Sequence, residues 1–220
     1  QPMRTLTAST IPLPQDSPRH DPPADRATPV TAPSSQGSNH SPRTTAGADV
    51  QFEEDHPRDG LYGPMHWLDD RGITALLAPY VSEGWGGDDY ARIGGLEGAD
   101  ARRLLSLLPR LARGDRQNNA PTIATLLRAA ASVDGLTLEG YMIRAPRRDE
   151  RVSIDTVCVP ESAISAITGS PAPEQACPSY LHWLALARVL AVPADAPAPD
   201  EIRFLTRTGS SEHWWWAWWD

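Results

Sequence analysis

The sequence predicts an α+β domain with a helical N-terminal half, followed by two antiparallel β-hairpins and a helix packed on their sheet. Apolar residues recur at helical spacing up to about residue 132, and from residue 136 the apolar period changes to two, as in strands. Short turns between consecutive strands favour antiparallel pairing, and helices segregated from strands favour the α+β class. The two hairpins could join in one four-stranded sheet.

Residues 1–58 are predicted to form a disordered arm in front of a single domain at 59–220. The arm is rich in Pro, Ser and Thr and has few large apolar side chains, so it cannot bury enough surface to offset chain entropy. About 160 residues remain, which is enough for one domain with a hydrophobic core. No signal peptide and no run of eighteen apolar residues is found, so we expect a cytoplasmic protein without a membrane span.

Three helices are predicted before the strands, over 71–83, 101–113 and 121–132. Each carries apolar side chains three or four positions apart, which is the spacing of one helix face. Aspartates before the first two helices and Pro121 at the start of the third are typical of helix N-termini. The Gly-rich stretch 84–95 indicates loops between the first and second helices.

Two hairpins and the helices between them complete the predicted domain. The first hairpin is predicted over 136–159, with strands at 136–144 and 151–159 and a turn at 146–150. The second has strands at 201–207 and 212–219 around a turn at 208–211. A short helix at 161–168 and a longer one at 179–192, capped by Ser179, are expected between the hairpins.

The closing strand of the second hairpin holds five of the eight tryptophans of the chain: Trp214, Trp215, Trp216, Trp218 and Trp219. Alternation along a strand places Trp214, Trp216 and Trp218 on one face, and Trp215 and Trp219 on the other. A strand with one face in water cannot carry this pattern. Both faces must be covered by the fold, by another chain or by a ligand.

Two interpretations of this strand remain open. If the domain covers both faces, the tryptophans are core residues and carry no functional information. If one face is open, its three indoles form a patch of roughly 450–750 Å², which is large for a monomer. Such a patch would stack on a proline-rich peptide, a sugar or a base, and the arm at 1–58 is itself a candidate ligand.

The charge of the chain is uneven. The net charge is −8, which argues against binding nucleic acid over the whole surface. Residues 101–151 nevertheless hold ten arginines against five acidic residues. This segment fits an anionic partner, unless the acidic flanks fold back and neutralise it.

A winged-helix DNA-binding protein is the alternative interpretation, because three helices followed by a hairpin match its element order. Thr122, Thr125 and Arg128 of the third helix would then face base edges. Arg147 and Arg148 at the hairpin tip would contact phosphates. The connection at 114–120 is long for a helix-turn-helix, and a helical layer packed on a sheet explains the same pattern.

A small-molecule enzyme is the third interpretation. The sequence contains no HxxxH or HExxH spacing, no CxxC, no phosphate-binding glycine loop and no GxSxG. No catalytic residue, metal ligand or cofactor is therefore predicted. The primary expectation is a non-catalytic binding or regulatory module that binds a protein or peptide through the Trp-rich strand and the basic hairpin.

Three internal segments, 115–122, 140–143 and 146–152, together with the Trp-rich ending, resemble segments of uncharacterised actinobacterial proteins. The resemblance covers about residues 60–220. It implies a bacterial source and no particular activity.

Overall fold

The computed structural model describes residues 60–82, 89–169, 180–206 and 212–220, all within one compact unit that spans Ala48–Asp220. The predicted arm at 1–58, the cap at Ser179 and the turn at 208–211 lie outside these ranges. The predictions made for those residues therefore stay predictions.

Five strands form one antiparallel sheet, which confirms the α+β class. They are β1 (Tyr90–Leu96), β2 (Thr137–Ile143), β3 (Arg151–Pro160), β4 (Glu201–Thr206) and β5 (His213–Trp218), in the order β1-β2-β3-β5-β4. Both predicted hairpins are present, and they join where β3 pairs with β5. The Trp-rich strand β5 consequently lies inside the sheet, while β4 lies at its edge.

The sequence predicted loops over 84–95. Residues 84–88 lie outside the described ranges, but strand β1 occupies the rest of this stretch from Tyr90 onward, so the prediction is corrected there. Ala91 and Ile93 are buried between more exposed neighbours, which is the alternation of a strand. Gly95 has a φ of 79°, and the pairing with β2 shifts register between Ile93 and Leu96. A bulge of this kind needs a left-handed backbone, which glycine adopts without a steric cost. The glycines that resembled loop signals therefore belong to a bulged strand.

Seven α-helices and one 3₁₀ helix are found in the described ranges. They are α1 (Trp67–Asp70), α2 (Ile73–Leu77), the 3₁₀ helix η1 (Ala78–Tyr80), α3 (Gly98–Leu107), α4 (Arg110–Arg113), α5 (Ile123–Ser132), α6 (Glu161–Thr168) and α7 (Tyr180–Val189). Pro109 predicts a kink in the helix at 101–113, and the structure interrupts the helix there: α3 and α4 are separate, because Leu108 before Pro109 is extended with a ψ of 136°. The helix predicted at 71–83 is likewise shorter and ends in η1.

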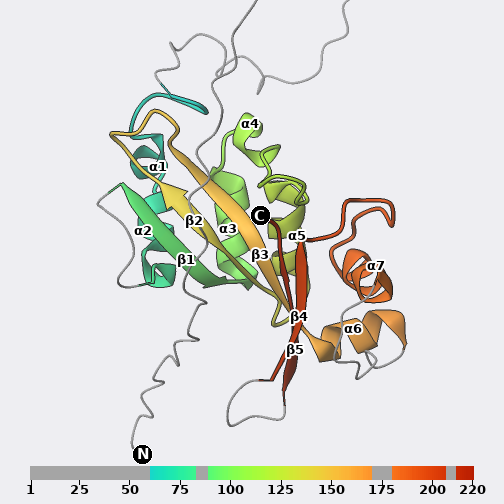
Figure 1. The fold of residues 1–220 in the computed structure, drawn as a ribbon. Coiled ribbons are helices and arrows are strands. Elements are labelled where there is room, and N and C mark those ends of the chain that lie inside the picture. Colours follow the sequence, from blue (N-terminus) through green and yellow to red (C-terminus); the bar gives the residue numbers. More distant parts are fainter. Residues whose placement is uncertain (1–59, 83–88, 170–179, 207–211) are drawn as a thin grey trace, which may run out of the picture. The chain divides into compact units, whose positions relative to one another are not determined.

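The core lies between one face of the sheet and the helices. Figure 1 shows α3 and α5 together on one side of the strands β2 and β3, with α6 and α7 beside the β4–β5 end. Leu138 of β2 and Val157 of β3 are fully buried against this helical layer, as are Leu126 and Leu127 of α5. We call this side the inner face of the sheet and the opposite side the outer face.

Candidate binding surface on the outer face of the sheet

Strand β5 divides its tryptophans between the two faces of the sheet. Trp215 and Trp219 point to the inner face and are 1% and 0% exposed. Trp214, Trp216 and Trp218 point to the outer face and are only partly buried. The domain therefore covers the inner face of β5, whereas it covers the outer tryptophans only in part.

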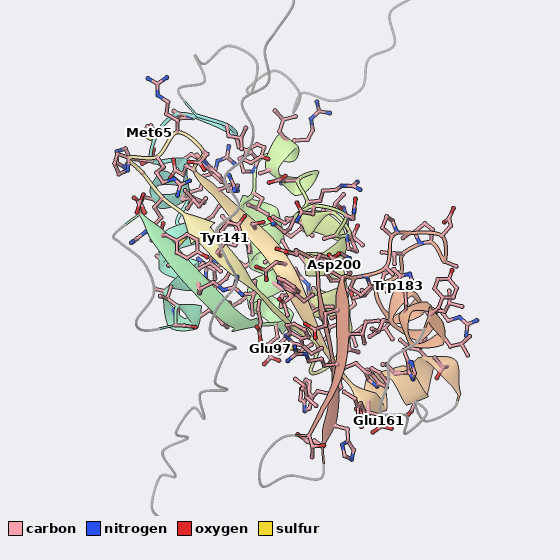
Figure 2. The ribbon with its side chains drawn as sticks, in the orientation of Figure 1. Met65, Glu97, Tyr141, Glu161, Trp183 and Asp200 are labelled. Carbon is pink, nitrogen blue, oxygen red and sulfur yellow. The ribbon has the colours of Figure 1, made fainter. Side chains whose placement is uncertain are left out.

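The inner tryptophans are core residues. The Trp215 ring stacks on His182 of α7 with ring centroids 4.7 Å apart. Trp219 meets Trp183 of the same helix edge to face at 6.2 Å, and Figure 2 labels Trp183 on that helix. Because these indoles fill the space between β5 and α7, Trp215 and Trp219 are not available to a partner.

On the outer face, three side chains form a stack that we call the Arg–Trp ladder: Arg203, Trp216 and Trp218. The Arg203 guanidinium lies 5.5 Å from the centre of the Trp216 ring, a cation–π distance. Trp216 and Trp218 are nearly parallel, with 6.3 Å between centroids and 19° between planes. Arg203 also donates from Nε to Glu201 Oε1 at 2.6 Å. The side chains of the ladder are therefore ordered by contacts with one another, without a partner.

Strand β3 continues the outer face beside the ladder. Cys158 lies opposite Trp216, and Thr156 lies opposite Trp218. The Cys158 thiol donates to Glu139 Oε1 across a sulfur–oxygen distance of 3.7 Å. Burial, reinforced by the Glu139 carboxylate, raises the pKa of this thiol far above its usual range. Cys158 therefore stays a neutral thiol and is a poor nucleophile.

Farther along the outer face, a partly buried ion pair joins β1 to β3. The Arg92 guanidinium contacts the Asp155 carboxylate at 2.6 Å, and Asp155 is 5% exposed. Burial raises the pKa of the nearby Glu139 carboxyl, and the second carboxylate at Asp155 acts in the same direction. This part of the face is polar and internally paired, in contrast to the ladder.

A hydrogen-bond network centred on Tyr141, which Figure 2 labels, occupies the end of the outer face away from β5. The Tyr141 hydroxyl donates to Gln117 Oε1 at 2.9 Å and accepts from Arg151 at 3.2 Å. Ser153 donates to the same Gln117 oxygen at 3.2 Å. An amide oxygen is not a base, so the Ser153 hydroxyl is not activated as a nucleophile by this contact.

The residues proposed for DNA contact lie in two separate places. Thr122 caps α5 by accepting from Thr125 N at 3.3 Å, and the two hydroxyls are 2.9 Å apart. Arg128 is exposed farther along α5, whereas Arg147 and Arg148 are exposed at the β2–β3 turn. The two groups thus belong to different elements.

Arg147 is also engaged locally. Its Nε and a terminal nitrogen bind the two Asp149 oxygens at 2.9 and 2.6 Å. The hydrogen bonds from Arg147 lower the pKa of the Asp149 carboxyl below its ordinary value. Six of the ten residues of α5 are buried, which leaves little of this helix to enter a groove.

A cavity of about 600 Å³ adjoins the third outer tryptophan, Trp214. Pro160 at the end of β3 and Glu161 at the start of α6 line it, together with Glu212 just before β5 and His213 at its first position. The Trp214 Nε1 atom is buried, and none of the described residues accepts its hydrogen. The cavity extends the aromatic surface of β5 toward α6.

Sequence reasoning missed Arg203, Glu139 and the Arg92–Asp155 pair. The alternation in 201–207 predicted a strand there, but only the register of β4 on β5 places Arg203 opposite Trp216. Arg92 and Asp155 are 63 positions apart in the chain, and their pairing needs the unpredicted strand β1. No local signal in the sequence reports either contact.

Comparison with protein-family models, curated proteins and solved structures finds no match to this chain. The resemblance to actinobacterial proteins therefore stays a prediction. In the ranges that the structure covers, no group of three or more metal-binding side chains is found. Nor does any helix there have the length and apolar character needed to cross a membrane.

Proposed function

We propose that the chain is a non-catalytic binding module whose outer sheet face, centred on the Arg–Trp ladder, docks a protein or peptide. The observation that supports it most is that Trp216 and Trp218 remain partly exposed, although Trp215 and Ala217 on the opposite face of the same strand are fully buried. Large indoles at a surface supply most of the binding energy of many interfaces.

The ladder suits a partner because its side chains are already ordered. Arg203 is fixed by Glu201 on one side and by the Trp216 ring on the other. Ordering flexible side chains is one of the main costs of association, and a preformed stack lowers that cost. Burying the exposed parts of the two rings then contributes to affinity with little loss of entropy.

A proline-rich segment is the partner chemistry that we favour. Such segments hold an extended conformation before binding, and their rings pack between aromatic side chains. Residues 11–34 of this chain contain several prolines and offer a ligand in cis or from another copy. The outer tryptophans supply the aromatic side of such a contact.

Titration of poly-L-proline into the full chain, followed by tryptophan fluorescence, tests this function. We expect a saturable change that the double variant Trp216→Ala/Trp218→Ala loses. Leu181→Ala is the matched control, because Leu181 is 70% exposed on α7 and lies outside the ladder. A response that the double variant retains, or no response from the unmodified chain to poly-L-proline or to a peptide of residues 11–34, would count against the proposal.

DNA binding is a weaker candidate that rests on the exposed Arg128, Arg147 and Arg148. Fluorescence anisotropy with random duplex DNA at low and moderate salt tests it. If the function is correct, Arg147→Glu/Arg148→Glu weakens binding and reduces its salt dependence. Binding that is absent, or that does not respond to salt, removes this candidate.

A further inference from the structure

Strand β4 has a free edge in the part of the chain that the structure describes. It pairs with β5 on one side and ends the strand order on the other. Asp200, labelled in Figure 2, immediately precedes it and accepts a hydrogen bond from Asp220 N at 2.9 Å. The open edge presents backbone N–H and C=O groups that can pair with an additional strand.

Two opposite charges lie on the outer side of this edge. Glu201 is opposite Trp218 and Arg203 is opposite Trp216, so both point to the outer face. Ile202 between them is opposite Ala217 and points to the inner face. Natural edges often repel a second strand with charges of one sign, but this edge carries one charge of each sign.

We propose that β4 pairs antiparallel with β4 of a second copy, about a twofold axis that passes between the two Ile202 residues. In this register Glu201 lies opposite Arg203 of the partner subunit, and Arg203 lies opposite Glu201 of the partner subunit. Directly opposed side chains in an antiparallel pair are close enough to interact, so both ion pairs form on the outer face. The two sheets become one continuous sheet.

Other registers fit the edge less well. A shift of one residue would place an outer side chain opposite an inner one, which a twofold axis through the sheet does not allow. Centring the axis on Arg203 would set two guanidinium groups against each other, and like charges directly opposite are destabilising. Only the register centred on Ile202 pairs every charge of the strand with its opposite.

The pairing brings the Arg–Trp ladders of the two copies side by side. Arg203 stacks on Trp216 of its own copy and also lies opposite Glu201 of the partner subunit. Because β4 begins at Glu201, this register pairs only Glu201, Ile202 and Arg203 of each copy, so the interface is small and we expect a concentration-dependent dimer of low affinity. This inference does not depend on the proposed function, because the dimer forms through backbone and charge contacts without any ligand.

Charge reversal followed by sedimentation velocity over a range of concentrations tests the dimer. We expect Glu201→Arg and Arg203→Glu each to weaken self-association by roughly tenfold or more, because each creates two pairs of like charge. An equimolar mixture of these two variants should dimerise again, because every opposed pair in the mixed dimer has opposite signs. The double variant Glu201→Arg/Arg203→Glu should also dimerise.

Arg110→Glu is the control, since this arginine is exposed on α4 and should leave association unchanged. Recovery in the mixture also excludes misfolding as the cause of the single-variant losses, since unfolded chains would not recover. The proposal is overturned if the unmodified chain stays monomeric at its highest soluble concentration. Single variants that dimerise normally, or a mixture that stays monomeric, overturn it equally.

Discussion

Trp215 and Trp216 are neighbours in the chain, yet their rings lie on opposite faces of the sheet. Trp215 is 1% exposed against His182 of α7, whereas Trp216 is partly exposed and stacks with Arg203 of β4. One strand therefore carries a core residue and a surface residue of the same type, side by side. This pair separates the structural role of Trp215 from the binding role that we propose for Trp216.

Replacing each of these two tryptophans by alanine should have unequal effects on stability. Trp215→Ala removes a fully buried indole and should cost about 3–5 kcal/mol of unfolding free energy. Trp216→Ala loses a cation–π contact and a ring stack, which together contribute about 1–2 kcal/mol. Urea denaturation followed by far-UV circular dichroism measures both. Equal losses would show that the outer face is as completely packed as the inner face.

Trp219 offers a test of buried polar groups. Its side chain is 0% exposed, and its Nε1 atom has no hydrogen-bond acceptor among the described residues. Trp219→Phe removes this unpaired donor, which offsets part of the loss in packing, so we expect a cost of about 1 kcal/mol. Trp219→Ala removes the whole ring and should lower the free energy of unfolding by about 3–5 kcal/mol. Chemical denaturation of the two variants decides whether the indole nitrogen is unpaired in solution.

Glu150 predicts a specific dependence of stability on pH. It is 1% exposed, and its Oε1 atom accepts from Leu68 N of α1 at 3.1 Å. Burial raises the pKa of its carboxyl above the ordinary value, although hydrogen bonds from the backbone of α1 act in the opposite direction. The unfolded chain therefore ionises first as pH rises, and stability decreases from about pH 4 up to the folded pKa.

Glu150→Gln removes this titration while keeping an acceptor oxygen. We expect the variant to melt at a higher temperature than the unmodified chain at pH 7–8 and at nearly the same temperature below about pH 4. Melting temperatures recorded from pH 3.5 to 8 measure the difference. A difference that does not change with pH would mean that Glu150 is not held in a raised-pKa environment.

Gly140 is a position where a side chain cannot fit. A Cβ atom there would press on the Ser153 carbonyl oxygen and lie 2.9 Å from Ile154 Cα, because β2 and β3 approach closely at their bulge. Gly140→Ala should therefore cost more than about 3 kcal/mol or prevent folding. Gly94→Ala is the control, since its nearest neighbour would be Glu139 Cγ at an ordinary 3.9 Å. Similar melting temperatures for the two variants would contradict the close approach of the strands.

Local patterns were sufficient for much of the fold. Alternation in 213–218 predicted both the strand β5 and the division of its tryptophans between two faces. The change of period after residue 135 predicted the β2–β3 hairpin, which the structure contains. These features depend only on neighbours in the chain. By contrast, the glycines of β1 and the break at Pro109 changed the boundaries of the predicted elements, because a bulge and a proline act against the simple periodic pattern.

The sequence alone determined that the tryptophans of β5 divide between two faces, since alternation along a strand requires it whatever surrounds the strand. Only the tertiary structure decided which face is core and which is surface. Strands β3 and β4 flank β5 within the sheet. The helix α7 packs on the inner face, where its His182 and Trp183 contact Trp215 and Trp219. Pairing partners such as Arg203 for Trp216 likewise come from strand register, which is set by contacts between distant segments.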